Sequence, residues 1–192
     1  MRFLPTPVVA AAFGCGLAGL LSADAATSAG APEMAAPARP QWTEVRWPFL
    51  LDQWGTGRAF RCPAWRCGVE VRLYVRPKVG FCNCATGVSD DIELDRVSDL
   101  ELLSERYAPR GPGERFRTGR MDGRSRAYTV ENPYGPRWSA LSVAFNDRCD
   151  VMVATVAAER ELPPEAVRAA LEFLQGSTVV GYAEATLNQS TQ

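Results

Sequence analysis

The sequence predicts an α+β domain, in which an antiparallel β-sheet carries two helices packed on one face and a disulfide-stapled hairpin near its N-terminal end. One observation is the alternation of apolar and polar residues over 68–75, which has the period of a half-buried strand. Another is a pair of segments with helical spacing of apolar residues, over 91–105 and from Pro164 to Gly176. The order of these elements favours an antiparallel sheet with helices packed against it.

The first expected hairpin joins the strand over 68–75 to a partner strand over 79–84 through a turn at 76–78. The helix over 91–105 follows, because Asp90 and Glu93 have the spacing of a capping box. Its apolar residues then fall on one helical stripe, at Leu94, Val97, Leu100 and Leu103. The hairpin and the helix each have one apolar side, as packing against a common core requires.

Residues 109–123 are rich in glycine, proline and arginine, which predicts a long loop. Strands are expected after it over 125–130, 139–146 and 149–157, with a hairpin turn at 146–148. Together with the first hairpin, these segments supply most of the predicted sheet.

The C-terminal part of the domain is expected to contain a helix and a last strand. Pro164 suits the first turn of a helix and Gly176 suits its end. The apolar segment over 178–184 then predicts a final strand of the sheet.

The chain is expected to be exported. It divides into a signal peptide, a flexible Ala/Pro-rich leader, one globular domain and a polar tail, over 1–25, 26–40, 41–187 and 188–192. Cleavage is predicted near Ala25, and Cys15 lacks the residue context of a lipoprotein processing site, so we expect no lipidation. The mature chain has no further apolar run of membrane-spanning length, which predicts a soluble periplasmic or secreted product.

Cys62, Cys67, Cys82 and Cys84 flank the first expected hairpin, which brings them to its open end. Three pairings of the four are possible, and the sequence does not choose among them. A bond between Cys82 and Cys84 closes a strained ring, so we expect each to bridge to Cys62 or Cys67. Cys149 makes the mature count odd, so it is a candidate free thiol, a link to a second subunit, a buried small residue at a strand end, or one arm of a bridge that leaves another cysteine free.

The alternative for the four cysteines is a zinc site, a cuprous copper site or a thiol-disulfide exchange centre. The spacings C-x4-C and C-x-C depart from the usual zinc knuckles, so no cofactor is expected and the metal site is kept as the alternative.

The chain contains no histidine. This excludes a Ser-His-Asp triad, a Cys-His nucleophile pair, histidine-ligated metals and covalent c-type haem. Carboxylates remain for enzymatic roles, but no spacing selects a pair, so enzyme activity is not expected. The formal net charge of -1 gives no reason to expect nucleic acid as a partner.

Two groups of residues are candidates for binding a protein or a small ligand. The first is a set of arginines that suits an anionic surface, unless it pairs with the acidic block over 89–105: Arg110, Arg115, Arg117, Arg120, Arg124 and Arg126. The second is a set of tryptophans that forms a stacking platform if exposed and fills a core if buried: Trp42, Trp47, Trp54 and Trp65. The sequence therefore predicts an exported binding or accessory protein, with metal handling or thiol redox chemistry as the alternative.

Overall fold

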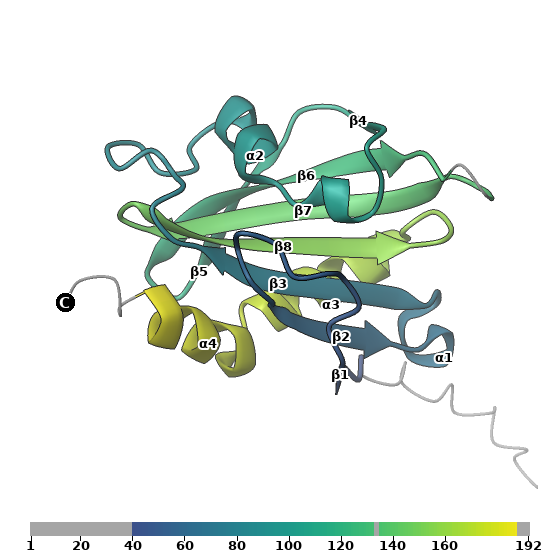
Figure 1. Cartoon of the computed structure of the whole chain (residues 1–192). Helices are drawn as coiled ribbons and strands as arrows, with labels where there is room; N and C mark the ends of the chain where they lie inside the picture. Colours follow the sequence, from purple (N-terminus) through teal and green to yellow (C-terminus); the bar gives the residue numbers. More distant parts are fainter. Residues whose placement is uncertain (1–39, 133–134, 188–192) are drawn as a thin grey trace, which may run out of the picture. The chain divides into compact units, whose positions relative to one another are not determined.

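The computed structural model of the chain describes residues 40–132 and 135–187. Within these residues, eight strands form one antiparallel sheet with the order β1-β2-β3-β8-β7-β6-β4, and β5 pairs with β6 (Figure 1). The strands span Thr43–Val45 (β1), Arg58–Cys62 (β2), Val71–Lys78 (β3), Tyr107–Pro109 (β4), Glu114–Thr118 (β5), Met121–Val130 (β6), Trp138–Asp147 (β7) and Asp150–Ala158 (β8). The predicted α+β class and antiparallel sheet are confirmed.

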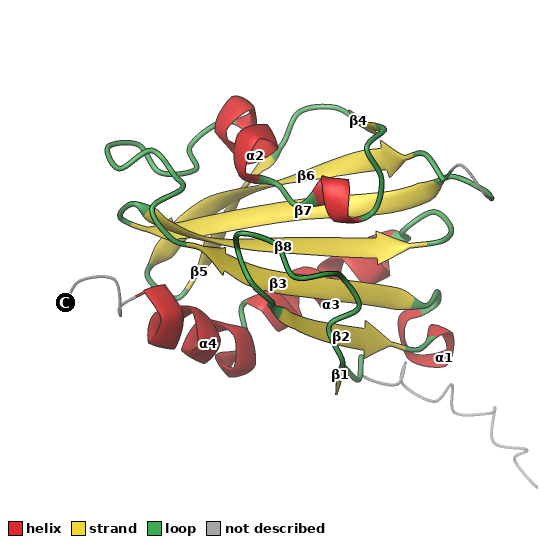
Figure 2. Ribbon diagram, in the orientation of Figure 1, coloured by secondary structure: helices red, strands yellow, loops and turns green. Residues whose placement is uncertain are grey.

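The helices cover both faces of this sheet. They span Ala64–Cys67 (α1), Asp91–Val97 (α2), Leu100–Leu102 (the 3-10 helix η1), Pro164–Leu174 (α3) and Ser177–Leu187 (α4). In Figure 2, α3 and α4 lie on one side of the sheet, whereas α2 lies on the other. Two helices therefore share one face as expected, but the helix at Asp91 is not one of them.

Strands β7 and β8 are buried on both faces. Val143 and Val156 belong to the core beneath α3 and α4. Ala144 and Val153 point the other way and pack with Leu94 of α2. Because successive residues of a strand face opposite sides, a sheet covered by helices on both sides needs such continuous apolar segments.

Helix α2 begins as predicted and ends early. The Asp90 side chain accepts a hydrogen bond from the Glu93 backbone N–H at 2.8 Å, which caps the first turn. The helix stops at Val97 because Ser98 adopts an extended backbone, with ψ at 159°. The predicted continuation to residue 105 is wrong, since only the short η1 follows.

The final strand expected over 178–184 is also wrong, because these residues lie in α4. Val179, Ala183 and Leu187 are buried at intervals of four residues, which is helical spacing. The β-branched run Thr178-Val179-Val180 favours a strand locally. Packing of α4 against the sheet overrides that preference.

The first hairpin pairs different strands from those expected. Strand β3 continues through the predicted turn to Lys78, and its hairpin partner is β2 rather than residues 79–84. Pro77 pairs with β8, whereas the pairing of β3 with β2 ends at Val75. Proline has no backbone N–H, and on the β2 side no described strand is present at this position to accept a hydrogen bond from one.

The predicted loop over 109–123 is mostly strand. It contains β5 and the start of β6, which form a hairpin around residues 119–120. Gly119 has a φ of 54°, a conformation that suits the first position of a two-residue hairpin turn. The arginines that alternate with Phe116 and Thr118 lie on the opposite side of β5 from the buried residues.

The expected signal peptide and polar tail lie outside the described residues, as does the leader except for Pro40. Within the described part of the chain, no helix combines the length and apolar character needed to cross a membrane.

Candidate functional site

The structure pairs the cysteines differently from the expected bridges. Cys62 bonds to Cys67 and Cys84 bonds to Cys149, so Cys149 is not a free thiol. Cys82 is the free cysteine of the described residues. The expectation failed because residues 79–84 do not return along β3. Instead, they run beside the β7–β8 turn, where the Cys82 backbone N–H donates to the Cys149 carbonyl oxygen at 3.2 Å.

The Cys82 thiol is buried and hydrogen-bonded. Its Sγ donates to the Arg148 carbonyl oxygen at 3.2 Å. Burial, together with the nearby carboxylates of Glu93 and Asp150, raises the pKa of Cys82 to about 11. A thiol of this kind is protonated at neutral pH and is a poor nucleophile.

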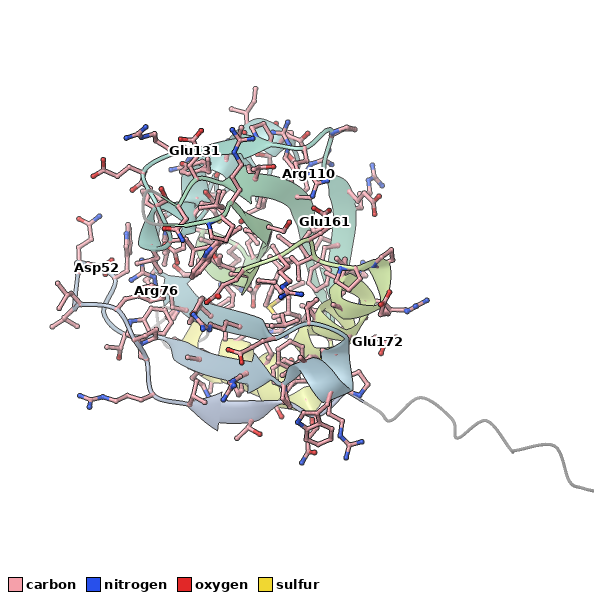
Figure 3. The ribbon with its side chains drawn as sticks, turned by 90° about the vertical axis from the view of Figure 1, so that its right-hand side faces the viewer. Asp52, Arg76, Arg110, Glu131, Glu161 and Glu172 are labelled. Carbon is pink, nitrogen blue, oxygen red and sulfur yellow. A yellow bond between two sulfur atoms is a disulfide. The ribbon has the colours of Figure 1, made fainter. Side chains whose placement is uncertain are left out.

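Most of the candidate arginines are held by carboxylates of the same molecule. The pairs are Arg110 with Glu161, Arg117 with Asp122, Arg120 with Asp147, Arg124 with Asp91, and Arg126 with Asp95. Figure 3 shows the side chains of Arg110 and Glu161 close together. Arg115 is the one candidate with no carboxylate within ion-pair distance among the described residues. The acidic block of the sequence therefore does neutralise Arg124 and Arg126, but the set does not form one cationic patch.

The candidate tryptophans lie at separate places. Trp42 stacks on Phe173 of α3, with ring centroids 5.0 Å apart. Trp47 and Trp54 lie over the side chains of Arg76 and Lys78 on the opposite face of the sheet. Trp65 is 70% exposed and contacts the neighbouring Arg66. The structure does not assemble these rings into one platform.

A buried charge cluster escaped the sequence analysis. Arg76, only 2% exposed, donates to both carboxylate oxygens of Asp99 at 2.7 and 2.8 Å. It also donates to Asp52, which lies beside it in Figure 3. Lys78 reaches Asp99 at 2.8 Å. These hydrogen bonds outweigh the effect of burial and raise the pKa of Arg76. The signal was present in β3, where Arg72, Arg76 and Lys78 occupy positions that alternate with those of the buried Val71, Leu73 and Val75.

A groove lies between β5 and α3, and we refer to it as the β5–α3 groove. It has a volume of about 580 Å³. Its floor is apolar and consists of Phe116, Leu162, Pro164, Val167 and Leu171. The residues from α3 recur every three to four positions, so the groove follows one stripe of the helix.

The lining of the β5–α3 groove also includes three arginines: Arg115, Arg117 and Arg168. Glu172 is the acidic residue among the lining side chains. Arg117 forms an exposed ion pair with Asp122, which is weak in water. Arg168, like Arg115, has no carboxylate partner among residues 40–132 and 135–187. The groove thus combines apolar surface with the positive charges of Arg115 and Arg168, which no carboxylate of the described residues pairs with.

The sequence predicts two of these arginines, Arg115 and Arg117, as candidate binding residues, but it does not predict the groove. Arg168 lies on the exposed side of an amphipathic helix, which is the ordinary place for a charged residue. Its proximity to Arg115 depends on how α3 packs beside β5, and no local pattern predicts that contact.

No protein-family model matches the chain, and no curated protein matches it either. Among the described residues, no three cysteine, histidine, aspartate or glutamate side chains gather as a group that could hold a metal ion.

Proposed function

We propose that this protein is exported and acts as a binding or accessory protein, holding an acidic segment of another polypeptide in the β5–α3 groove. The observation that carries this function is the pair Arg115 and Arg168. Both lie at an apolar groove and neither has a carboxylate partner among the described residues. An acidic ligand would supply the missing negative charge while its apolar side chains covered the floor.

Export to the periplasm or outside the cell is supported by two features. The bridges Cys62–Cys67 and Cys84–Cys149 are of the kind that persists in oxidising compartments. The apolar N-terminal segment, followed by small residues near Ala25, has the pattern of a secretory signal.

Binding is favoured over catalysis because, among the described residues, the groove is lined by no cysteine or serine and by a single carboxylate, Glu172. The strongly raised pKa values belong to Cys82 and Tyr128, and neither residue lines the groove. Arginines remain charged and do not transfer protons at neutral pH, but they recognise carboxylates well. The lining residues are therefore suited to holding an anion rather than to converting it.

Metal handling or thiol exchange is less well supported than binding of an acidic segment. Four cysteines form disulfides, and a disulfide sulfur lacks the thiolate charge that zinc or cuprous copper requires. The remaining thiol of the described residues, Cys82, is buried.

A direct test measures the binding of a short fluorescent peptide by fluorescence anisotropy. The probe has glycine and serine flanks around a central Val-Glu-Val-Glu-Val. We expect Arg168→Glu to weaken binding about fivefold or more, because it places negative charge against an acidic ligand. Arg46→Glu is the matched control, since Arg46 is exposed and does not line the groove. Equal weakening by both variants, or no binding to the wild-type protein, would contradict the proposed function.

A further inference from the structure

We propose that the acidic segment binds as an additional β-strand on the open edge of β5, with its acidic and apolar residues alternating. This inference rests on the proposed function of the β5–α3 groove. It adds the conformation of the ligand, its sequence pattern and the backbone groups that hold it.

Among the described strands, β5 pairs with β6 alone, which leaves its other edge open. Thr118 and Met121 flank the two-residue turn of the β5–β6 hairpin, where the closing pair exchanges hydrogen bonds. Bonded and non-bonded pairs alternate along an antiparallel ladder, so Phe116 is again bonded to β6. Arg115 and Arg117 consequently direct their N–H and C=O groups away from β6.

A side-chain contact agrees with this assignment. Gln175, which follows α3, donates from its Nε2 atom to the Arg117 carbonyl oxygen at 2.9 Å. That carbonyl group therefore faces α3 and the groove. The remaining outward groups are the N–H and C=O of Arg115 and the N–H of Arg117. An unpaired strand edge of this kind is a template for a further strand.

Side-chain alternation on β5 determines what the added strand must carry. Phe116 and Thr118 are buried on one side of β5, whereas Arg115 and Arg117 are exposed on the other. Residues of a paired strand that lie opposite the arginines share their side of the sheet. The ligand therefore needs acidic residues opposite Arg115 and Arg117, and apolar residues between them to cover the groove floor.

The edge also selects against a second copy of the same chain. Two β5 edges brought together would place arginine side chains near one another, and like charges opposite each other are destabilising. An acidic strand meets no such repulsion. Since β5 has five residues, it spans about 17 Å and fits about five residues of ligand.

Ester substitution tests the backbone contacts without changing the protein. In the peptide with the central Val-Glu-Val-Glu-Val, one form replaces the N–H groups of both glutamates by ester oxygens, and a matched form does so at the valines. An antiparallel strand would use the glutamate N–H groups, which lie opposite the outward groups of Arg115 and Arg117. A parallel strand would use the valine N–H groups instead.

We expect one ester form to bind about tenfold more weakly than the unmodified peptide and the other to bind within about twofold of it. Amide exchange measured by NMR on the wild-type protein should also slow at Arg115 and Arg117 when the unmodified peptide is added. Equal affinities of all three peptides without amide protection would overturn the added strand while leaving groove binding intact. No binding of any of the three would overturn the proposed function itself.

Discussion

Arg115 and Arg124 face each other directly across the β5–β6 ladder. Arg124 is neutralised by Asp91 of α2, whose carboxylate also accepts from the Gly113 backbone N–H at 3.0 Å. The Arg124 guanidinium holds the pKa of Asp91 below its usual range. Arg115 has no such partner among the described residues, so its charge stays uncompensated although it lies opposite a second arginine.

Arg115→Thr should stabilise the fold and weaken ligand binding. Removing one charge of a like-charged cross-strand pair is expected to raise the free energy of unfolding by about 0.2 to 1 kcal/mol, and threonine suits a strand. Urea denaturation measures this change, and anisotropy with the acidic peptide measures the loss of affinity. A variant that is less stable and binds normally would show that Arg115 serves the fold.

The two disulfides should differ in their contribution to stability. Cys84–Cys149 joins residues 65 apart, whereas Cys62–Cys67 joins residues 5 apart. Loop-closure entropy predicts about 4 kcal/mol for the long bridge and about 2 kcal/mol for the short one. Paired serine variants, Cys84→Ser/Cys149→Ser and Cys62→Ser/Cys67→Ser, allow the comparison by urea denaturation. A greater loss for the short bridge would contradict this account.

Cys82 should resist alkylation in the folded protein. Its pKa, raised from 9.0 to about 11, predicts about a hundredfold less thiolate at pH 8 than in an ordinary thiol. Because the thiolate fraction grows about tenfold per pH unit below the pKa, the rate at Cys82 should still rise at pH 10, whereas the rate of an ordinary thiol levels off near pH 9. Rates with iodoacetamide, followed by mass spectrometry from pH 7 to 10, test this expectation, with the urea-unfolded protein as the reference. Fast modification of Cys82 at pH 7 would revive the thiol-exchange alternative.

Asp99 should matter far more to stability than Asp52. Asp99→Asn leaves Arg76 and Lys78 buried with too little negative charge, which is expected to cost about 3 to 5 kcal/mol. The Asp52 side chain is 38% exposed, so Asp52→Asn should cost below about 1 kcal/mol. Thermal unfolding of both variants provides the comparison. Similar melting temperatures for the two variants would contradict this, because they would show that Asp52 and Asp99 stabilise the buried Arg76 equally.

The sequence predicted the elements whose signals are local. The Asp90 cap, the start of α3 at Pro164 and the β7–β8 hairpin each depend on residues close together in the chain. Non-local packing determined the rest. The segment over 178–184 has the composition of a strand, but it forms α4 because Val179 and Ala183 can be buried against the sheet on one helical side.

The candidate site was predictable only in part. The arginines of β5 stand out by number, and the acidic block suggested that some of them would be neutralised. Which arginine stays unpaired depends on the β5–β6 register, which places Arg115 opposite Arg124 rather than beside α2. The groove itself needs β5 next to α3, and these two elements are far apart in the sequence.

Charge reversal in the β5–α3 groove tests the central claim most directly. The double variant Arg115→Glu/Arg168→Glu and the wild-type protein are each titrated with the Val-Glu-Val-Glu-Val peptide and with Val-Lys-Val-Lys-Val. We expect the wild-type protein to prefer the acidic peptide about tenfold or more, and the variant to prefer the basic one. The same preference in both proteins, or no preference in either, would contradict binding of an acidic segment in this groove.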